Sequence, residues 1–431
     1  MRRLTLLLVV LALFAAACGD DTPRASGTDG VATSDLAREV STAPDADLAA
    51  VSAAEQAFAA ELYRVLAADE GNLVVSPLSI HIALAMALGG AEGDTAAEMA
   101  QALQVAGLDP SALHGALNAL DATLESRNRT EPPIDDREQQ VQVSVVNSLW
   151  GQDGFAFVQE YLDLLARNYG AGIRLVDFRQ AAEEARVAIN AWVAEETNDR
   201  ITDLIPQGSI DDLTRLVLVN AVYLDATWAR PFDPEATFDA PFVRLDGSEV
   251  AVPTMHGYQL HALYAVGDGW QAIDLPYTGD ELSMLVVVPD AGQFADVEGR
   301  LTGGLLDEVR TGLTPSVVDL SLPKFEIRNQ LSLVEALQAL GISAAFDPGA
   351  SDFTGISTGD QLYISGVIHE AFIAVDEAGT EAAAATAVII GTTSMPTDIV
   401  ALDIDRPFLF FLQDRATGAL LFVGRVVDPT A

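Results

Sequence analysis

The stretch from 377 to 395 constrains this chain most, because it fits two kinds of secondary structure. Four consecutive alanines within it have the highest helix propensity: Ala382, Ala383, Ala384 and Ala385. Read as a strand, one face carries no charge and nothing larger than valine: Thr380, Ala382, Ala384, Thr386 and Val388. The stretch therefore fits an alanine-rich linker or surface helix. It equally fits a loop that slides between two strands without burying a charge.

The order of these residues resembles the reactive-loop hinge of the serpins, a family of serine-protease inhibitors. Inhibitory members carry Glu-x-Gly-Thr-Glu followed by small residues, and this chain has the same pattern: Glu377, Gly379, Thr380, Glu381, the four alanines and Thr386. Residues 402–412 resemble the C-terminal signature of the family, and residues 72–80 resemble its Asn-x-x-x-Ser-Pro-x-Ser-Ile segment. The resemblance covers roughly 51–429.

Composition limits the partners of the chain. With 431 residues, it could hold two or three average domains or one large one. A net charge of −40 repels nucleic acid and argues against a polyanion-binding site. Arg127, Arg129 and Arg137 are interleaved with acids, so no heparin site is expected. The only lysine is Lys324. We expect a monomer.

The amino terminus predicts export and a lipid anchor. Two arginines, an apolar run and three alanines precede Cys18, the only cysteine, so no intrachain disulfide forms. Small residues ending at a cysteine resemble the bacterial lipoprotein box. We therefore expect a signal peptide over 1–17, lipid on Cys18, a flexible tether over 18–50 and a folded domain over 51–431. The protein would face outward on the cell membrane; ordinary secretion is the alternative.

The pattern along the domain is of the α+β type, with helices early and strands late. Residues 216–224 are almost wholly apolar, which predicts a strand covered on both faces, with Asn220 needing partners. Pro132 and Pro133 predict a loop, and segments 408–413 and 419–426 a hairpin. The resemblance implies the serpin fold: helices around a large mixed main sheet, smaller sheets, and an exposed reactive loop over about 377–400.

Little in the sequence supports a catalytic function. Ser76 and His369 could join an aspartate in a hydrolase triad, but no Gly-x-Ser-x-Gly elbow surrounds a serine. No phosphate-binding glycine loop occurs. The histidines lack metal-ligand spacing: His81, His114, His256, His261 and His369. We expect no enzyme activity, metal or cofactor.

The resemblance implies other roles for the polar residues. Four counterparts form a buried hydrogen-bond cluster, the shutter, below the centre of the main sheet: Ser76, Ser79, Asn220 and His369. Three more meet at the top of that sheet, the breach: Trp228, Lys324 and Glu377. The alternative for the shutter is a static buried histidine. The Lys324–Glu377 pair is expected to be exposed and to contribute at most about 1 kcal/mol, so its role would be gating more than stability.

The resemblance also implies a mechanism. A serine protease, or a cysteine protease, would attack the loop and form an acyl-enzyme, and the cut loop would insert into the main sheet from Gly379 onward. Family spacing puts the scissile bond at Thr393–Ser394, with uncertainty of one or two residues. Small side chains favour elastase-like or subtilisin-like targets, and Met395 would admit a chymotrypsin-like one. The alternative is a non-inhibitory member that acts as a binding or carrier protein.

Overall fold

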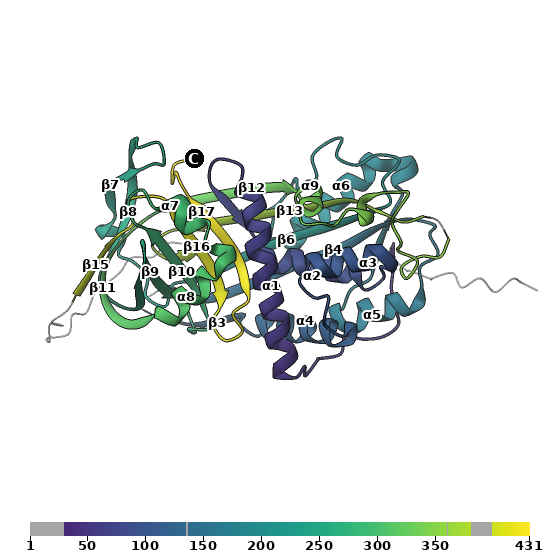
Figure 1. The fold of residues 1–431 in the computed structure, drawn as a ribbon, viewed down its shortest axis with the longest axis horizontal. Coiled ribbons are helices and arrows are strands. Elements are labelled where there is room, and N and C mark those ends of the chain that lie inside the picture. The colour runs from purple at the N-terminus through teal and green to yellow at the C-terminus, as the bar shows by residue number, and fades with distance from the viewer. Residues whose placement is uncertain (1–29, 135–136, 360, 381–398) are drawn as a thin grey trace, which may run out of the picture.

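The computed structural model describes residues 30–134, 137–359, 361–380 and 399–431. These residues form one elongated body, with most helices gathered in one half, the strands β7–β11 in the other, and β12 and β13 running along the body (Figure 1). The helices are α1 (Asp45–Leu66), α2 (Pro77–Leu88), α3 (Gly93–Ala102), α4 (Pro110–Glu125), α5 (Gln159–Tyr169), α6 (Phe178–Glu196), α7 (Phe294–Glu298), α8 (Leu305–Gly312) and α9 (Val334–Ala339).

The main sheet is mixed and contains eight strands of the described chain. Its order is β1 (Val31–Ala32), β5 (Ile173–Val176), β4 (Arg137–Gln152), β6 (Leu216–Thr227), β14 (Gly379–Thr380), β13 (Ile364–Val375) and β12 (Phe325–Ser332), and β3 (Arg129–Ile134) pairs with β4. β6 runs parallel to β13, and β4 runs parallel to β5. The other pairings are antiparallel.

A second sheet contains nine described strands. Its order is β15 (Ile399–Asp403), β11 (Thr314–Pro323), β8 (Glu249–Gly267), β9 (Trp270–Pro276), β10 (Leu282–Pro289), β16 (Phe408–Asp414), β17 (Leu420–Val426) and β2 (Leu73–Val75), and β7 (Phe238–Val243) pairs with β8. β16 and β17 form the hairpin that the sequence predicted. The α+β prediction is confirmed.

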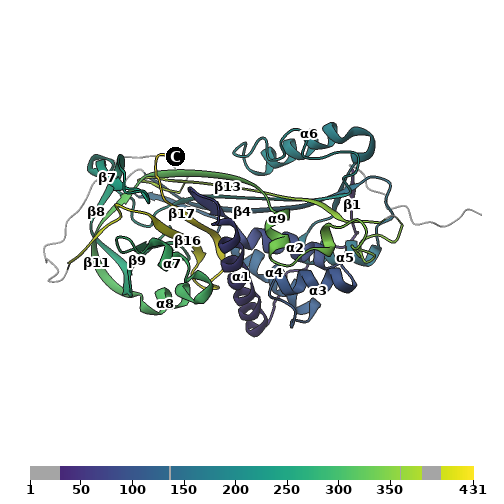
Figure 2. The same cartoon turned by 45° about the horizontal axis from the view of Figure 1, so that its top comes forward.

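Strand β6 is buried on both faces, as its apolar run predicted. One face packs into the main core through Leu216, Leu218 and Val222. The opposite face, with Val217 and Val219, packs with residues of α6. Figure 2 shows α6 lying over one face of the main sheet, while α2 and its neighbours lie on the other. This two-sided cover explains why the strand lacks a polar alternation.

The predicted flexible tether is wrong for residues 30–50. Val31 and Ala32 pair with β5 as an edge strand, and α1 already begins at Asp45. Between them, the Arg38 side chain binds α4 through Asn118, Asp121 and Glu125. The segment is polar and lacks periodicity, yet backbone pairing and arginine hydrogen bonds attach it to the domain.

The predicted loop at Pro132 and Pro133 is also wrong, because both prolines lie in β3. Among the described strands it pairs only with β4, and its register shifts between Glu131 and Ile134. Proline lacks an amide hydrogen, so it is tolerated in an edge strand or at such an irregularity.

Candidate functional site

The predicted hinge begins inside the main sheet. Gly379 pairs with Thr227 of β6, while Thr380 pairs with Ala226 of β6 and Val375 of β13. Further down, β6 and β13 pair directly with each other. The two strands are thus already separated at their upper end by one short strand.

The expected loop of about 377–400 is therefore corrected at both ends. Residues 379–380 belong to β14, and residues 399–400 belong to β15. Insertion from Gly379 onward is corrected in the same way, because Gly379 and Thr380 are already paired. The other predicted hinge and cleavage residues, together with Cys18, lie outside the described residues: Glu381, Ala382, Ala383, Ala384, Ala385, Thr386, Thr393 and Ser394.

Glycine is required at position 379 because the backbone of β6 lies too close to leave room for a side chain. A Cβ atom at this position would lie 2.0 Å from the carbonyl oxygen of Ala226 and 2.8 Å from the Cα of Thr227. Real Cβ atoms do not approach backbone that closely, so only glycine lets the chain enter the sheet here.

The segment 228–232 forms a wall against which the hinge is held. The backbone N–H of Trp228 donates to the carbonyl of Ala378 (2.9 Å), and that of Phe232 donates to the carbonyl of Glu377 (2.8 Å). The Trp228 indole Nε1–H donates to the carbonyl of Asp376 (3.0 Å). The wall thus holds three consecutive residues before β14.

Tyr277 connects this wall to Thr380. Its ring stacks on Trp228 with centroids 4.5 Å apart, and its hydroxyl lies 2.6 Å from the Thr380 hydroxyl. Both Tyr277 and Thr380 are buried. This role could not be predicted from the local sequence, because Tyr277 simply follows Leu275 and Pro276 at the end of a strand.

Lys324 and Glu377 form the predicted ion pair, and the carboxylate is buried. Lys324 Nζ lies 2.6 Å from Glu377 Oε2, and the Thr237 hydroxyl donates to Oε1 at 2.8 Å. Burial alone would raise the pKa of Glu377. The hydrogen bonds from Lys324 and Thr237 outweigh it, so the pKa lies below its ordinary value. The expectation of an exposed pair is corrected, since the Glu377 side chain is only 8% exposed.

The four predicted shutter residues come together below the middle of the main sheet. The backbone N–H of Ser76 donates to His369 Nε2 (3.1 Å), which leaves the proton on Nδ1 to bind Asn220 Oδ1. The Asn220 amide donates to Ser79 Oγ and to Asn147 Oδ1. Sequence reasoning missed Asn147, because β4 contains other polar residues, such as Gln142, Ser144 and Ser148, that mask the signal.

This cluster cannot act as a hydrolase triad in the observed geometry. Both ring nitrogens of His369 are occupied, and the contact from Ser76 comes from its backbone, not its hydroxyl. Complete burial lowers the pKa of His369 to about 3, so the ring is neutral at physiological pH. The cluster therefore links α2 to β4, β6 and β13 through neutral groups.

The described residues contain neither a metal-binding cluster nor a membrane-spanning helix. No group of three or more potential ligands from His, Cys, Asp and Glu is arranged to hold a metal ion there. None of the helices that the structure describes has both the length and the apolar character needed to cross a bilayer.

Comparisons with known proteins agree with this architecture. The family model described as Serpin (serine protease inhibitor) matches residues 53–429. Leukocyte elastase inhibitor of Bos taurus is 36% identical over 395 residues, covering 88% of this chain and 99% of that protein. The native-state crystal structure of tengpin, a thermophilic serpin, has a TM-score of 0.78 at 27% identity, covering 92% of this chain and 97% of that one.

One further solved structure is the thyroxine-binding globulin complex with thyroxine. Its TM-score is 0.75 at 27% identity, and the match covers 88% of this chain and 99% of that chain. The family-model match, the close relatives and the shared fold lead to one conclusion: the chain belongs to the serpin family.

Proposed function

We propose that this protein inhibits a serine-type endopeptidase, or a cysteine-type one, as a suicide substrate. It would not act as a catalyst itself. The protease would cut the loop and remain attached as an acyl-enzyme while the freed loop enters the main sheet. The observation that carries the proposal is β14, a strand already started between β6 and β13 and followed in sequence by small residues.

The register of β14 defines where the following residues would go. Continued along β6, the pairing of Thr380 with Ala226 would bring Thr386 opposite Asn220. Continued along β13, the pairing of Thr380 with Val375 would bring Thr386 opposite His369. The two strands give the same answer, so an inserted Thr386 would lie in the shutter.

The side chains of the loop suit this path. Thr380 points into the core beside Tyr277, and alternation would give Ala382, Ala384 and Thr386 the same face. These residues bring little volume and no charge into the sheet. Glu381 would lie on the opposite face.

Strand insertion would also improve the pairing of the sheet. β6 and β13 are parallel where they meet, whereas β14 runs antiparallel to both. A longer β14 would replace one parallel ladder by two antiparallel ladders, which add hydrogen bonds. The uncut form would then be kinetically trapped, and inhibition would be a race between insertion and deacylation. In such a race, about 1.4 kcal/mol on either barrier changes the rate ratio tenfold.

The loop sequence supports a proposal for the class of protease that would be the target. Cleavage at Thr393–Ser394 favours an elastase-like or subtilisin-like enzyme, and Met395 would allow a chymotrypsin-like one. No Arg or Lys lies between Gly379 and Asp405, which disfavours trypsin-like enzymes.

A protease panel tests the proposal directly. The chain is mixed with elastase, subtilisin, chymotrypsin and trypsin, and the products are separated by SDS gel electrophoresis. We expect a covalent complex with at least one of the first three. Cutting the loop should also raise the temperature of unfolding, because the inserted form is more stable. A cut chain with unchanged heat resistance and no covalent complex would contradict the proposal.

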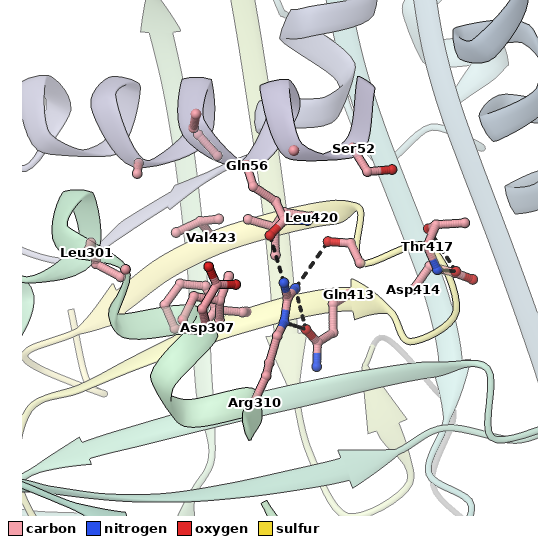
Figure 3. Close-up of a pocket in the computed structure, with 18 of the residues that line it drawn as sticks. Ser52, Gln56, Leu301, Asp307, Arg310, Gln413, Asp414, Thr417, Leu420 and Val423 are labelled. Atoms are coloured by element: carbon pink, nitrogen blue, oxygen red, sulfur yellow. Dashed lines mark hydrogen bonds between the residues drawn. The ribbon is translucent and has the colours of Figure 1, made fainter. Parts of the chain in front are cut away.

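A second candidate, a carrier, is favoured by a cavity of about 890 Å³ between α1, α8 and the β16–β17 hairpin (Figure 3). Arg310 lies in it and donates to the side-chain oxygens of Gln56 and Gln413 and to the carbonyl of Gly418. No described acid forms an ion pair with it, so an apolar carboxylic acid would fit. The related globulin in complex with thyroxine supports a carrier role in the family. Calorimetry with small aromatic carboxylates, using wild type and Arg310→Gln, tests the hypothesis that the protein is a carrier.

Anchoring through lipid on Cys18 is proposed as well. Its support is the sequence ahead of Gly30: an apolar run and small residues that end at Cys18. Labelling with a radioactive fatty acid in a bacterial host should mark the wild type and leave Cys18→Ala unlabelled.

A further inference from the structure

A small cavity borders the wall at 228–232, and we call it the wall pocket. Its volume is about 250 Å³. It is lined by the wall, by β8, and by the end of β9 with the turn that follows: Trp228, Ala229, Arg230, Phe232, Leu260, His261, Ala262, Leu275, Pro276 and Asp280. The wall segment therefore lines the pocket and also holds the hinge.

The lining favours a small apolar group. Phe232, Leu260 and Leu275 provide aromatic and branched surface, and the volume suits one aromatic ring with a short side arm. Phe232 packs edge-to-face against Trp228, so the pocket reaches the ring system that also stacks on Tyr277.

The exposed lining residues of the wall pocket favour a negatively charged ligand. Arg230 is exposed and forms no ion pair or hydrogen bond with any described residue, which is unusual in a chain with 23 basic and 63 acidic residues. His261 and Asp280 also line the wall pocket and are exposed, and Asp280 is the acidic residue of the lining. Because no carboxylate among the described residues pairs with Arg230, a ligand carboxylate would find a free guanidinium there.

We propose that the wall pocket binds a small aromatic or branched carboxylate, and that binding fixes the wall in the position that holds the hinge. The ligand would contact Trp228 and Phe232, the two wall residues whose backbone N–H groups donate to Ala378 and Glu377. A ligand that binds only the packed wall stabilises that state by mass action, so opening of the wall becomes rarer. That this would slow loop insertion rests on the proposed inhibitory function; the binding and its effect on the wall do not.

Calorimetry tests the binding, with 3-phenylpropionate as the probe. Its uncharged amide and the cation phenethylamine have similar apolar bodies and test the preference for charge. We expect the carboxylate to bind, and Arg230→Gln to weaken it about tenfold, the effect of one charge-assisted hydrogen bond. Arg64→Gln, an exposed arginine on α1, is the matched control and should leave the affinity unchanged. Equal affinity of both variants for the probe, or no binding to wild type, would overturn the proposal.

Hydrogen exchange tests the coupling without any protease. The amides of Trp228 and Phe232 donate directly to the hinge, so their exchange reports opening of the wall. At a probe concentration ten times Kd, their exchange should slow about tenfold. Ala262→Phe, which would fill the pocket, should abolish the effect of the probe. Binding by calorimetry with unchanged exchange at these amides would refute the coupling. Failure to trap any protease would instead contradict the proposed function and leave these two results standing.

Discussion

Thr380 lies at the boundary between the part of the hinge that already belongs to the main sheet and the part that follows. Its side chain is buried (1% exposed), and its hydroxyl contacts the hydroxyl of Tyr277. Its backbone pairs with β6 on one side and with β13 on the other. Sequence alternation placed it on a small, uncharged face. The structure supplies the reason, because that face points into a packed core.

If the protein inhibits a protease as proposed, arginine at position 380 should convert it into a plain substrate. Thr380→Arg would force a charge into a buried strand at a cost of several kcal/mol, which hinders both the present β14 and its extension. The measurement is the ratio of covalent complex to cleaved chain with an active protease. Thr314→Arg, on an exposed strand position, is the control and should behave as wild type. A covalent complex formed at the wild-type ratio by Thr380→Arg would contradict the insertion mechanism.

Loss of one hydroxyl should loosen the hinge. Tyr277→Phe keeps the stacking on Trp228 but removes the contact with Thr380, which is worth about 1 kcal/mol. Amide exchange of residues 379–380 should therefore quicken severalfold. Tyr264→Phe removes a comparable hydroxyl contact, with Gln271, away from the hinge and should change nothing there. Identical exchange in the two variants would show that the Thr380 contact is unimportant.

Polar residues inside apolar strands were the best sequence signal at this scale. Asn220 and His369 could be predicted to need partners because a buried polar group without hydrogen bonds is costly. Tyr277 and Thr237 could not be found in this way, since neither interrupts an apolar run. Their roles depend on which strands become neighbours, and that information is not local.

Elements with strong periodicity were predicted well, and weakly patterned ones were not. The strand at 216–224 and the hairpin at 408–426 follow from apolar runs and turn residues. β1 and β3 escaped prediction because each is an edge strand held by backbone pairing. Edge strands need little apolar pattern, so a polar or proline-containing segment is easily mistaken for a loop.

The segment before α1 should contribute to stability through Arg38. Its guanidinium binds Asn118 and two acids of α4, Asp121 and Glu125, and is about one-quarter exposed. We expect Arg38→Ala to lower the free energy of unfolding by about 1–2 kcal/mol. Arg64→Ala removes a well-exposed pair with Glu61 and should cost less than about 0.5 kcal/mol. Urea titration of both variants provides the comparison; equal midpoints would mean that the segment is only loosely attached.

The molecule as a whole should respond to pH through its buried titratable groups. Burial raises the pKa of Glu55 to about 8, although a hydrogen bond from the Leu420 backbone opposes the shift. Burial lowers the pKa values of His81 and His114 to about 4 and that of His369 to about 3. The native state therefore holds a proton on Glu55 and excludes protons from three histidines.

Replacement of Glu55 should change the pH profile of stability. The pKa of Glu55 is higher in the native than in the unfolded chain, so its contribution is complete below about pH 4.5 and is lost as pH rises towards 8. Over that range wild type should lose up to roughly 1.4 kcal/mol per pH unit relative to Glu55→Gln. Glu61→Gln, exposed on the same helix, is the control. Parallel profiles of wild type and Glu55→Gln would show that Glu55 is ionised in the native state.

The three histidines act in the opposite direction. Their pKa values are lower in the native than in the unfolded chain, so stability should fall as pH drops from about 6.5 towards 4. Urea midpoints measured across this range provide the test. If the midpoint stays constant from pH 6.5 to 4.5, the histidines are not buried in neutral form.

The place where the chain enters the domain has a geometric consequence. β1 joins the outer edge of the main sheet at one pole of the body, whereas β15, where the chain returns after residue 398, lies at the other (Figures 1 and 2). A membrane attached ahead of Gly30 would lie near the end of the body that carries β1. β15 would then lie at the end of the body that is away from the lipid surface.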